Sequence, residues 1–144
     1  MTAMTPIRGF FILATISLCA AASIGTDEIK IVANLDVGVS EISRDELNRI
    51  FLITKTSLQG TNHVEPVLET AGPVHRMFLK EYIGRTDAAL MTYYRSLVFT
   101  GRASIPKTFR SDSELIEYVA KTKGAIGYVS ANANTAGVKT LKVK

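Results

Sequence analysis

The chain has 144 residues with 17 basic and 13 acidic side chains, a formal net charge of +4 and an apolar share of 47%, which is ordinary for a folded globular protein. This length fits one domain once an N-terminal leader is removed. Because the positive charge is mild and interspersed with acidic residues, it excludes the electrostatic pattern of a nucleic-acid-binding protein. We therefore expect no nucleic acid among its partners.

The N-terminal residues differ from the rest and predict a cleavable secretory signal peptide over residues 1–22. Arg8 is the only charged residue before Asp27, and a run of apolar and small residues follows it. A basic start, a short apolar stretch and small residues at its end are typical of such a signal. A retained membrane anchor is the alternative, but the run is shorter than the roughly 20 apolar residues that span a bilayer. We expect cleavage near Ala22, a periplasmic location and one domain over residues 23–144.

The only cysteine, Cys19, lies within this leader. A lipoprotein signal usually has Leu three positions before its cysteine and Gly or Ala directly before it, whereas this chain has Ile16 and Leu18. We therefore interpret Cys19 as an apolar filler of the leader. The mature chain then contains no cysteine, which excludes a disulfide framework, thiol chemistry and cysteine metal sites.

The mature chain predicts strands and helices that are mixed along the sequence. In the first half we expect a strand over 29–35, a helix after the capping box of Ser43 and Glu46, a short or edge strand over 64–68 that contains Pro66, and a helix from Pro73 to Gly84. In the second half we expect a helix from Thr86, a loop over 100–110, a helix from the capping box of Ser111 and Glu114 to Gly124, and strands over 125–129 and 138–143. This order predicts a layered α/β or α+β domain with no internal linker.

Several segments of the mature chain, taken in their order, resemble the phosphate-binding proteins of ABC transporters. The matching segments are 31–34, 42–51, 64–67, 72–79 and 124–129, of which the last, Gly-Ala-Ile-Gly-Tyr-Val, is the most specific. Residues 99–102 also resemble a segment of the short, single-domain members of this family. The resemblance implies an α/β fold of the type 2 periplasmic-binding-protein kind, a single compact domain with a mixed sheet flanked by helices. Full-length members have two lobes that close on phosphate, and this chain, at about half their length, is expected to keep mainly one lobe.

The resemblance also implies a place for an oxyanion at the start of the helix near residue 73. The family binds its ligand with backbone amides and hydroxyls at helix starts, helped by an arginine, and the matching residues here are Thr70, Gly72, Val74 and Arg76. Where the family has Ser-Gly-Thr, this chain has Ala-Gly-Pro over 71–73, so two hydroxyls and one amide are missing. An ordinary helix start with a solvated arginine is the alternative interpretation.

A second basic candidate is the loop that contains Arg102, with Lys107 and Arg110 nearby. A positive loop attracts an anion or an acidic partner, although solvated loop charge is the simpler interpretation. The two histidines, His63 and His75, have no metal-ligand spacing and are predicted to lie on the surface. The chain has no catalytic motif, and we expect no enzyme, no metal and no cofactor. The tyrosines are predicted to belong to the core.

Two functions stay open at this point. The first is a periplasmic solute-binding module for inorganic phosphate or a related oxyanion, associated with ABC-type transport or sensing. The second is a ligand-free interaction module that kept the fold and binds an envelope or membrane protein partner.

Overall fold

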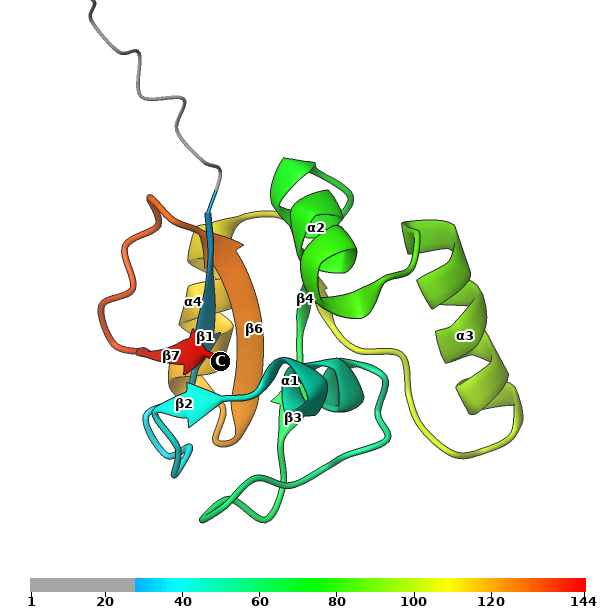
Figure 1. Cartoon of the computed structure of the whole chain (residues 1–144), viewed down its shortest axis with the longest axis horizontal. Helices are drawn as coiled ribbons and strands as arrows, with labels where there is room; N and C mark the ends of the chain where they lie inside the picture. The colour runs from blue at the N-terminus through cyan, green and yellow to red at the C-terminus, as the bar shows by residue number, and fades with distance from the viewer. Residues whose placement is uncertain (1–27) are drawn as a thin grey trace, which may run out of the picture.

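A five-stranded mixed sheet forms the centre of residues 28–144, the part of the chain that this computed structural model describes (Figure 1). The predicted leader lies outside the described residues. The strands lie in the spatial order β2 (Glu41–Ile42), β7 (Lys139–Val143), β1 (Ile29–Ala33), β6 (Ala125–Ser130) and β3 (Glu65–Pro66). Strand β1 runs antiparallel to both β6 and β7, whereas β2 and β3 run parallel to their neighbours. The sheet is therefore mixed, as the sequence predicts.

Alternation along the central strands divides the core into two layers. Ile31 on β1 and Tyr128 on β6 belong to the larger cluster, on one face of the sheet. Val32 and Val129, their neighbours along the chain, belong to the smaller cluster on the other face. Because side chains along a strand point alternately to opposite faces, both faces of these strands need a cover of helices.

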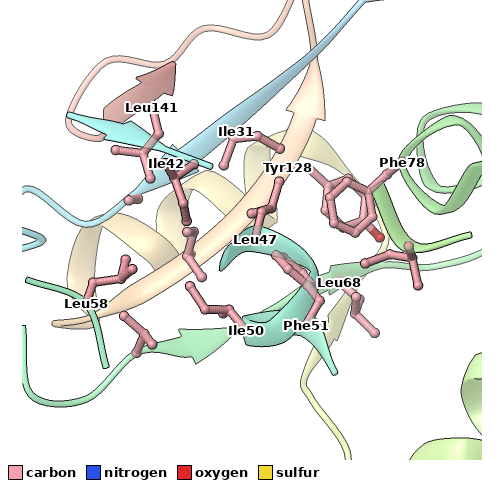
Figure 2. Packing of buried hydrophobic residues seen from close by; sticks show 14 of the residues in the cluster. Ile31, Ile42, Leu47, Ile50, Phe51, Leu58, Leu68, Phe78, Tyr128 and Leu141 are labelled. Atoms are coloured by element: carbon pink, nitrogen blue, oxygen red, sulfur yellow. The ribbon is translucent and has the colours of Figure 1, made fainter. Parts of the chain in front are cut away.

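Helices cover both faces, which gives three layers (Figure 1). The helical segments are α1 (Arg44–Phe51), α2 (Pro73–Phe78), which continues as the π-helical turn η1 (Leu79–Ile83), α3 (Asp87–Phe99) and α4 (Asp112–Lys121). Helix α4 packs in the smaller cluster, and the other helices contribute to the larger one, in which Leu47, Ile50 and Phe51 of α1 lie against the sheet (Figure 2). The described residues thus form a single α/β domain, as predicted.

The capping signals in the sequence are confirmed to different extents. Ser43 and Glu46 form a complete capping box at the start of α1. At the start of α4, the Ser111 hydroxyl accepts from the Glu114 amide, but the Glu114 carboxylate accepts from the amide of Arg110 instead of that of Ser111. The helix predicted from Pro73 forms as two segments, because the chain widens to a π-helical turn after Phe78.

Pro66 occupies the edge position that the sequence predicts. The amides of Glu65 and Val67 both donate to the β6 side, to Gly124 and Ile126, so the position of Pro66 faces away from β6 and needs no donor there. After Val67 the chain pairs with a different strand, because β4 (Leu68–Glu69) forms a separate two-stranded parallel sheet with β5 (Thr108–Phe109). Strand β5 lies within the segment that the sequence predicts as a loop, and β2 is also absent from the prediction.

Gly124 is needed because two backbone segments meet there. Its φ of +75° lies in the left-handed region, and a Cβ at this position would lie 2.1 Å from the carbonyl oxygen of His63. The Glu65 amide also donates to the Gly124 carbonyl at 2.9 Å, which fixes the close approach. Gly84, which ends η1, has a similar φ of +71° but open space around it.

These two glycines form a matched pair for a test of backbone crowding. We expect Gly84→Ala to lower the free energy of unfolding by about 1 kcal/mol, the strain of a left-handed alanine. Gly124→Ala should cost about 3 kcal/mol or more, because the clash with the His63 carbonyl adds to that strain. Urea unfolding of both variants measures the difference. Equal losses in the two variants would contradict the close approach.

Among residues 28–144, no helix has both the length and the apolar character that crossing a bilayer requires.

Candidate functional site

A chain of buried and partly buried hydrogen bonds connects four elements around Tyr128. The Glu69 amide donates to the Tyr128 hydroxyl at 3.0 Å, and that hydroxyl lies 2.5 Å from Nδ1 of His75. Nε2 of His75 lies 2.8 Å from the Asp87 carboxylate. Every group in the chain has a partner when Tyr128 donates to Nδ1 and the Nε2 proton is donated to Asp87. The network thereby ties β4, β6, α2 and the start of α3 together.

The prediction that both histidines lie on the surface is wrong for His75. Its side chain is only 1% exposed, whereas His63 is exposed as expected. The error has a simple cause: His75 lies three residues before Phe78, on the buried face of α2, and its polar atoms are satisfied by Tyr128 and Asp87. Within residues 28–144, no group of three or more His, Cys, Asp or Glu side chains is arranged to hold a metal ion.

An aromatic stack holds Tyr128 in place. Its ring lies parallel to that of Phe78 with centroids 3.8 Å apart, and Phe51 meets Phe78 edge-on at 4.6 Å (Figure 2). Burial raises the pKa of Tyr128 above its ordinary value, so the hydroxyl stays protonated and acts as a hydrogen-bond donor. The tyrosine is therefore a core residue, as predicted, that carries a polar connection through the core.

Two carboxyl groups, those of Glu69 and Asp112, lie together where β4 ends and α4 begins. Burial, followed by the hydrogen bond and the charge of Asp112, raises the pKa of Glu69 to about 8. Burial disfavours the Asp112 anion, but hydrogen bonds from Glu69 and Ser130 hold the pKa of Asp112 below its usual range. The Ser130 hydroxyl donates to Asp112 at 2.5 Å. At neutral pH the pair therefore consists of a protonated Glu69 that donates to an ionised Asp112.

The predicted anion-binding site at residues 70–76, here called the seat, offers free backbone amides but few side-chain donors. Gly72 is the N-cap of α2 with extended backbone, and a side chain there would make only ordinary contact with the chain. The amides of Val74 and His75, in the first turn, have no intrahelical acceptor. Thr70 is exposed, and its amide is already used by the carbonyl of Phe109.

Arg76 lies on the flank of this seat, in a cavity between α2 and α3. The cavity measures about 530 Å³, and its basic lining residues are Arg76, Lys80 and Arg85. None of the three is in an ion pair within the described residues, and the only carboxylate in the lining, Asp87, is engaged by His75. The guanidinium of Arg85 lies over the ring of Tyr93, 4.8 Å from its centroid, which positions that charge.

The structure does not bring the predicted site residues into one place. Arg102 lines a different cavity, of about 420 Å³, beside β3, together with Lys107 and Pro106. Thr70, Gly72, Val74 and Arg76 stay together because they belong to the start of α2. Sequence reasoning missed Lys80 and Arg85. The spacing of Arg76 and Lys80, four apart on one helix face, is the signal that could have identified a shared cationic surface.

The fold is that of a single α/β domain that matches one lobe of phosphate-binding proteins. The chain is similar to PstS from Borrelia burgdorferi, with 14% identity, a TM-score of 0.63, and coverage of 82% of this chain and 47% of that one. It is also similar to an ABC-type phosphate transport receptor from Vibrio cholerae, at 18% identity and a TM-score of 0.55, with 81% and 46% of the two chains covered.

A structure from Clostridium perfringens, described as a phosphate ABC transporter substrate-binding protein with bound phosphate, has 15% identity and a TM-score of 0.53, with 81% and 45% covered. The chain therefore spans about half the length of these neighbours, which are binding proteins rather than enzymes. At these identities the likeness shows the fold. No protein-family model and no curated protein sequence matches the chain.

The hydroxyl of Tyr128 is open to a direct test. Tyr128→Phe leaves the Glu69 amide and Nδ1 of His75 without their partner, so we expect the free energy of unfolding to fall by about 1–3 kcal/mol. Tyr118→Phe is the control, because the Tyr118 hydroxyl is only partly buried between Lys107 and Glu65. Urea unfolding compares the two. A loss at Tyr128 no larger than that at Tyr118 would show that the buried network does not stabilise the fold.

The acid pair predicts how stability depends on pH. The pKa of Glu69 is raised to about 8, so between its unfolded value and pH 8 the folded state holds a proton that the unfolded state has lost, and stability falls as pH rises. Glu69→Gln keeps a donor for Asp112 and cannot ionise. We therefore expect the stability of the variant relative to that of the parent protein to increase as pH rises from 5 to 9. Melting temperatures measured across this range check it, and parallel curves for the two proteins would count against a protonated Glu69.

Proposed function

We propose that the protein is a periplasmic, single-lobe module that binds phosphate or a related oxyanion and takes part in ABC-type transport or sensing. The observation that carries this proposal is the cationic cavity of Arg76, Lys80 and Arg85, in a fold shared with proteins described as binding phosphate. Export through the signal peptide at residues 1–22 is part of the same proposal. In it, Thr70, Gly72 and Val74 supply a hydroxyl and backbone amides beside the cavity.

The charge arrangement in the cavity supports an anionic ligand. Arg76 and Lys80 are four residues apart on continuous helical backbone, and like charges at this spacing repel each other. No carboxylate of the described chain forms an ion pair with either of them, so their repulsion is not relieved within the domain. An anion between them relieves it and gains charge-assisted hydrogen bonds.

Arg85 is suited to hold such an anion from the opposite wall. It precedes α3, whose N-cap Thr86 and first-turn residue Asp87 also line the cavity. A guanidinium presents two parallel donors to an oxyanion, and the ring of Tyr93 limits its freedom before binding. The cavity therefore has an ammonium and one guanidinium from the α2 side and one guanidinium from the α3 side.

The acid pair of Glu69 and Asp112 limits where the ligand can lie. At neutral pH it carries one negative charge at the end of β4, directly before Thr70. An anion is repelled from that side of the seat and attracted to the side of Arg76. The flank of α2 is thus electrostatically preferred over the sheet end.

Isothermal titration with phosphate and with sulfate tests this function. We expect Arg76→Ala and Arg85→Ala each to weaken binding roughly tenfold or more, the loss of a hydrogen bond to a charged group. Arg95→Ala is the control, since Arg95 is exposed on α3 but does not line the cavity. Thr70→Val removes the hydroxyl of the seat, so a loss of affinity in this variant shows that the seat contributes to anion binding. Absence of heat and of any thermal shift at millimolar phosphate and sulfate would refute oxyanion binding.

A further inference from the structure

A second cavity, separate from the cationic one, lies between two loops beside the edge strand β3. It measures about 420 Å³ and has apolar walls formed by Ile53, Val64, Pro66, Ala103, Ile105 and Pro106. Its basic lining residues are Arg102 and Lys107, with His63 nearby, and it contains one carboxylate, that of Glu65. We call this cavity the β3 groove. The Glu65 carboxylate already accepts a hydrogen bond from the hydroxyl of Tyr118 at 2.6 Å.

The end of α3 places large apolar side chains in water next to this groove. Phe99 is 95% exposed, and Val98 and Ile105 are exposed as well. The amides of Arg102 and Ala103 both donate to the carbonyl of Leu97, so the chain folds back and joins the end of α3 to the groove wall. Folding alone gives no reason to expose a phenylalanine so fully. Phe99 lies three residues before Arg102 of the groove lining, so its exposed ring is close along the chain to a hollow with apolar walls.

Helix α3 stands out from the body of the domain (Figure 1). Only Leu90 and Tyr94 of its residues are buried. The hydroxyls of Tyr93 and Tyr94 each donate at 2.6 Å to carbonyls at the end of α1, those of Leu52 and Phe51. These bonds hold the helix rigidly while its outer face and its end stay free for a partner.

The opposite wall of the groove holds a strained residue. Ile53 follows α1 with a φ of +57°, the only positive φ of a non-glycine residue in the described chain. A β-branched residue in the left-handed region is a genuine outlier, and such strain is concentrated at functional sites. Its amide donates to the carbonyl of Ile50 at 3.0 Å, and its side chain forms part of the groove wall.

The charge of this region selects the partner. The lining of the β3 groove contains two basic side chains, Arg102 and Lys107, and neither is in an ion pair within the described residues. The one carboxylate of the lining, that of Glu65, is engaged by the hydroxyl of Tyr118. The surface that includes the β3 groove therefore attracts a negatively charged partner, and apolar walls with a basic rim favour one that carries apolar side chains as well.

We propose that the β3 groove docks an extended segment of another protein in which an aromatic or branched apolar side chain is flanked by carboxylates. The apolar side chain fills the pocket between Ile53 and Ile105 and packs beside Phe99. The carboxylates pair with Arg102 and Lys107 on the rim. An anionic lipid surface is the other partner with this chemistry, but the apolar walls enclose a hollow, which a flat bilayer cannot fill and a side chain can. This inference is independent of oxyanion binding, since none of its residues lines the cationic cavity.

The test uses the whole protein and a phage-displayed library of random peptides. We expect the selected peptides to share an apolar residue flanked by Asp or Glu. Synthetic copies should bind with an affinity that falls roughly tenfold or more in Phe99→Ser, as expected from the loss of one buried aromatic contact. Arg102→Glu should weaken binding further and reduce its dependence on salt. The matched control is Leu35→Ser, because Leu35 is 63% exposed but lies in the turn after β1 and lines neither cavity.

Three outcomes overturn the proposal. The first is a selection that yields no shared pattern. The second is that the selected peptides bind the Phe99→Ser variant as tightly as they bind the parent protein, which shows that they bind at another surface. The third is sedimentation of the protein with phosphatidylglycerol vesicles in a manner that depends on Phe99, without peptide binding, which assigns the surface to a membrane. Phe99 is almost fully exposed, so its replacement leaves the folded core intact, and an unchanged melting temperature confirms this.

Discussion

The position of the cationic cavity depends on Tyr128, an aromatic core residue that also joins two hydrogen bonds. Its ring stacks on Phe78 and its hydroxyl connects the Glu69 amide to His75. Through His75 and Asp87 the same connection reaches the start of α3. A short helix such as α2 has little stability of its own, so this anchor and the packing of Phe78 determine where its outer residues, Arg76 and Lys80, point.

The second constraint is that nearby carboxylates do not neutralise the basic side chains at the cationic cavity. The buried network uses Asp87, and the acid pair of Glu69 and Asp112 shares one proton, so these carboxylates do not neutralise the cations of α2 and α3. Elsewhere on the domain the ordinary pattern holds, with pairs such as Arg49 with Asp45 and Lys121 with Glu117. Surface ion pairs of this kind contribute little to stability. For the two proposals above, what matters is that the basic residues lining the two cavities are in no ion pair within the described residues.

Much of this fold could be predicted from local sequence, because local rules decide it. The Ser43 capping box, the edge position of Pro66 and the apolar strand at residues 125–129 depend on residues close together in the chain. The burial of His75 could not be predicted this way, since its partner Tyr128 lies 53 residues further along the chain. The short strands β2 and β5 were missed for the same reason, because two residues carry no periodicity and only the neighbouring strand defines them.

The candidate site shows the same limit. The sequence named Arg76 in one candidate anion site and Arg102 in a second one, and the tertiary structure places them in two cavities. Lys80 and Arg85 are unremarkable in sequence and become important only because η1 ends at Gly84 and turns the chain back along α2. Whether basic residues form one site or two is decided by such turns rather than by composition.

The exposure of its basic side chains gives the cationic cavity its physical character. The solved neighbours are about twice as long, and the described domain corresponds to one of their lobes. Because Arg76, Lys80 and Arg85 are exposed, the attraction that they exert on an anion is reduced by water and screened by salt over about 8 Å at physiological ionic strength. Under the proposed function, tight binding therefore requires that the cavity is covered and water is excluded. The proposed docking surface at the far end of α3 is a means of recruiting a protein that covers the cavity. The start of α3 lines the cationic cavity at Asp87, and its end is hydrogen-bonded to the loop that lines the β3 groove.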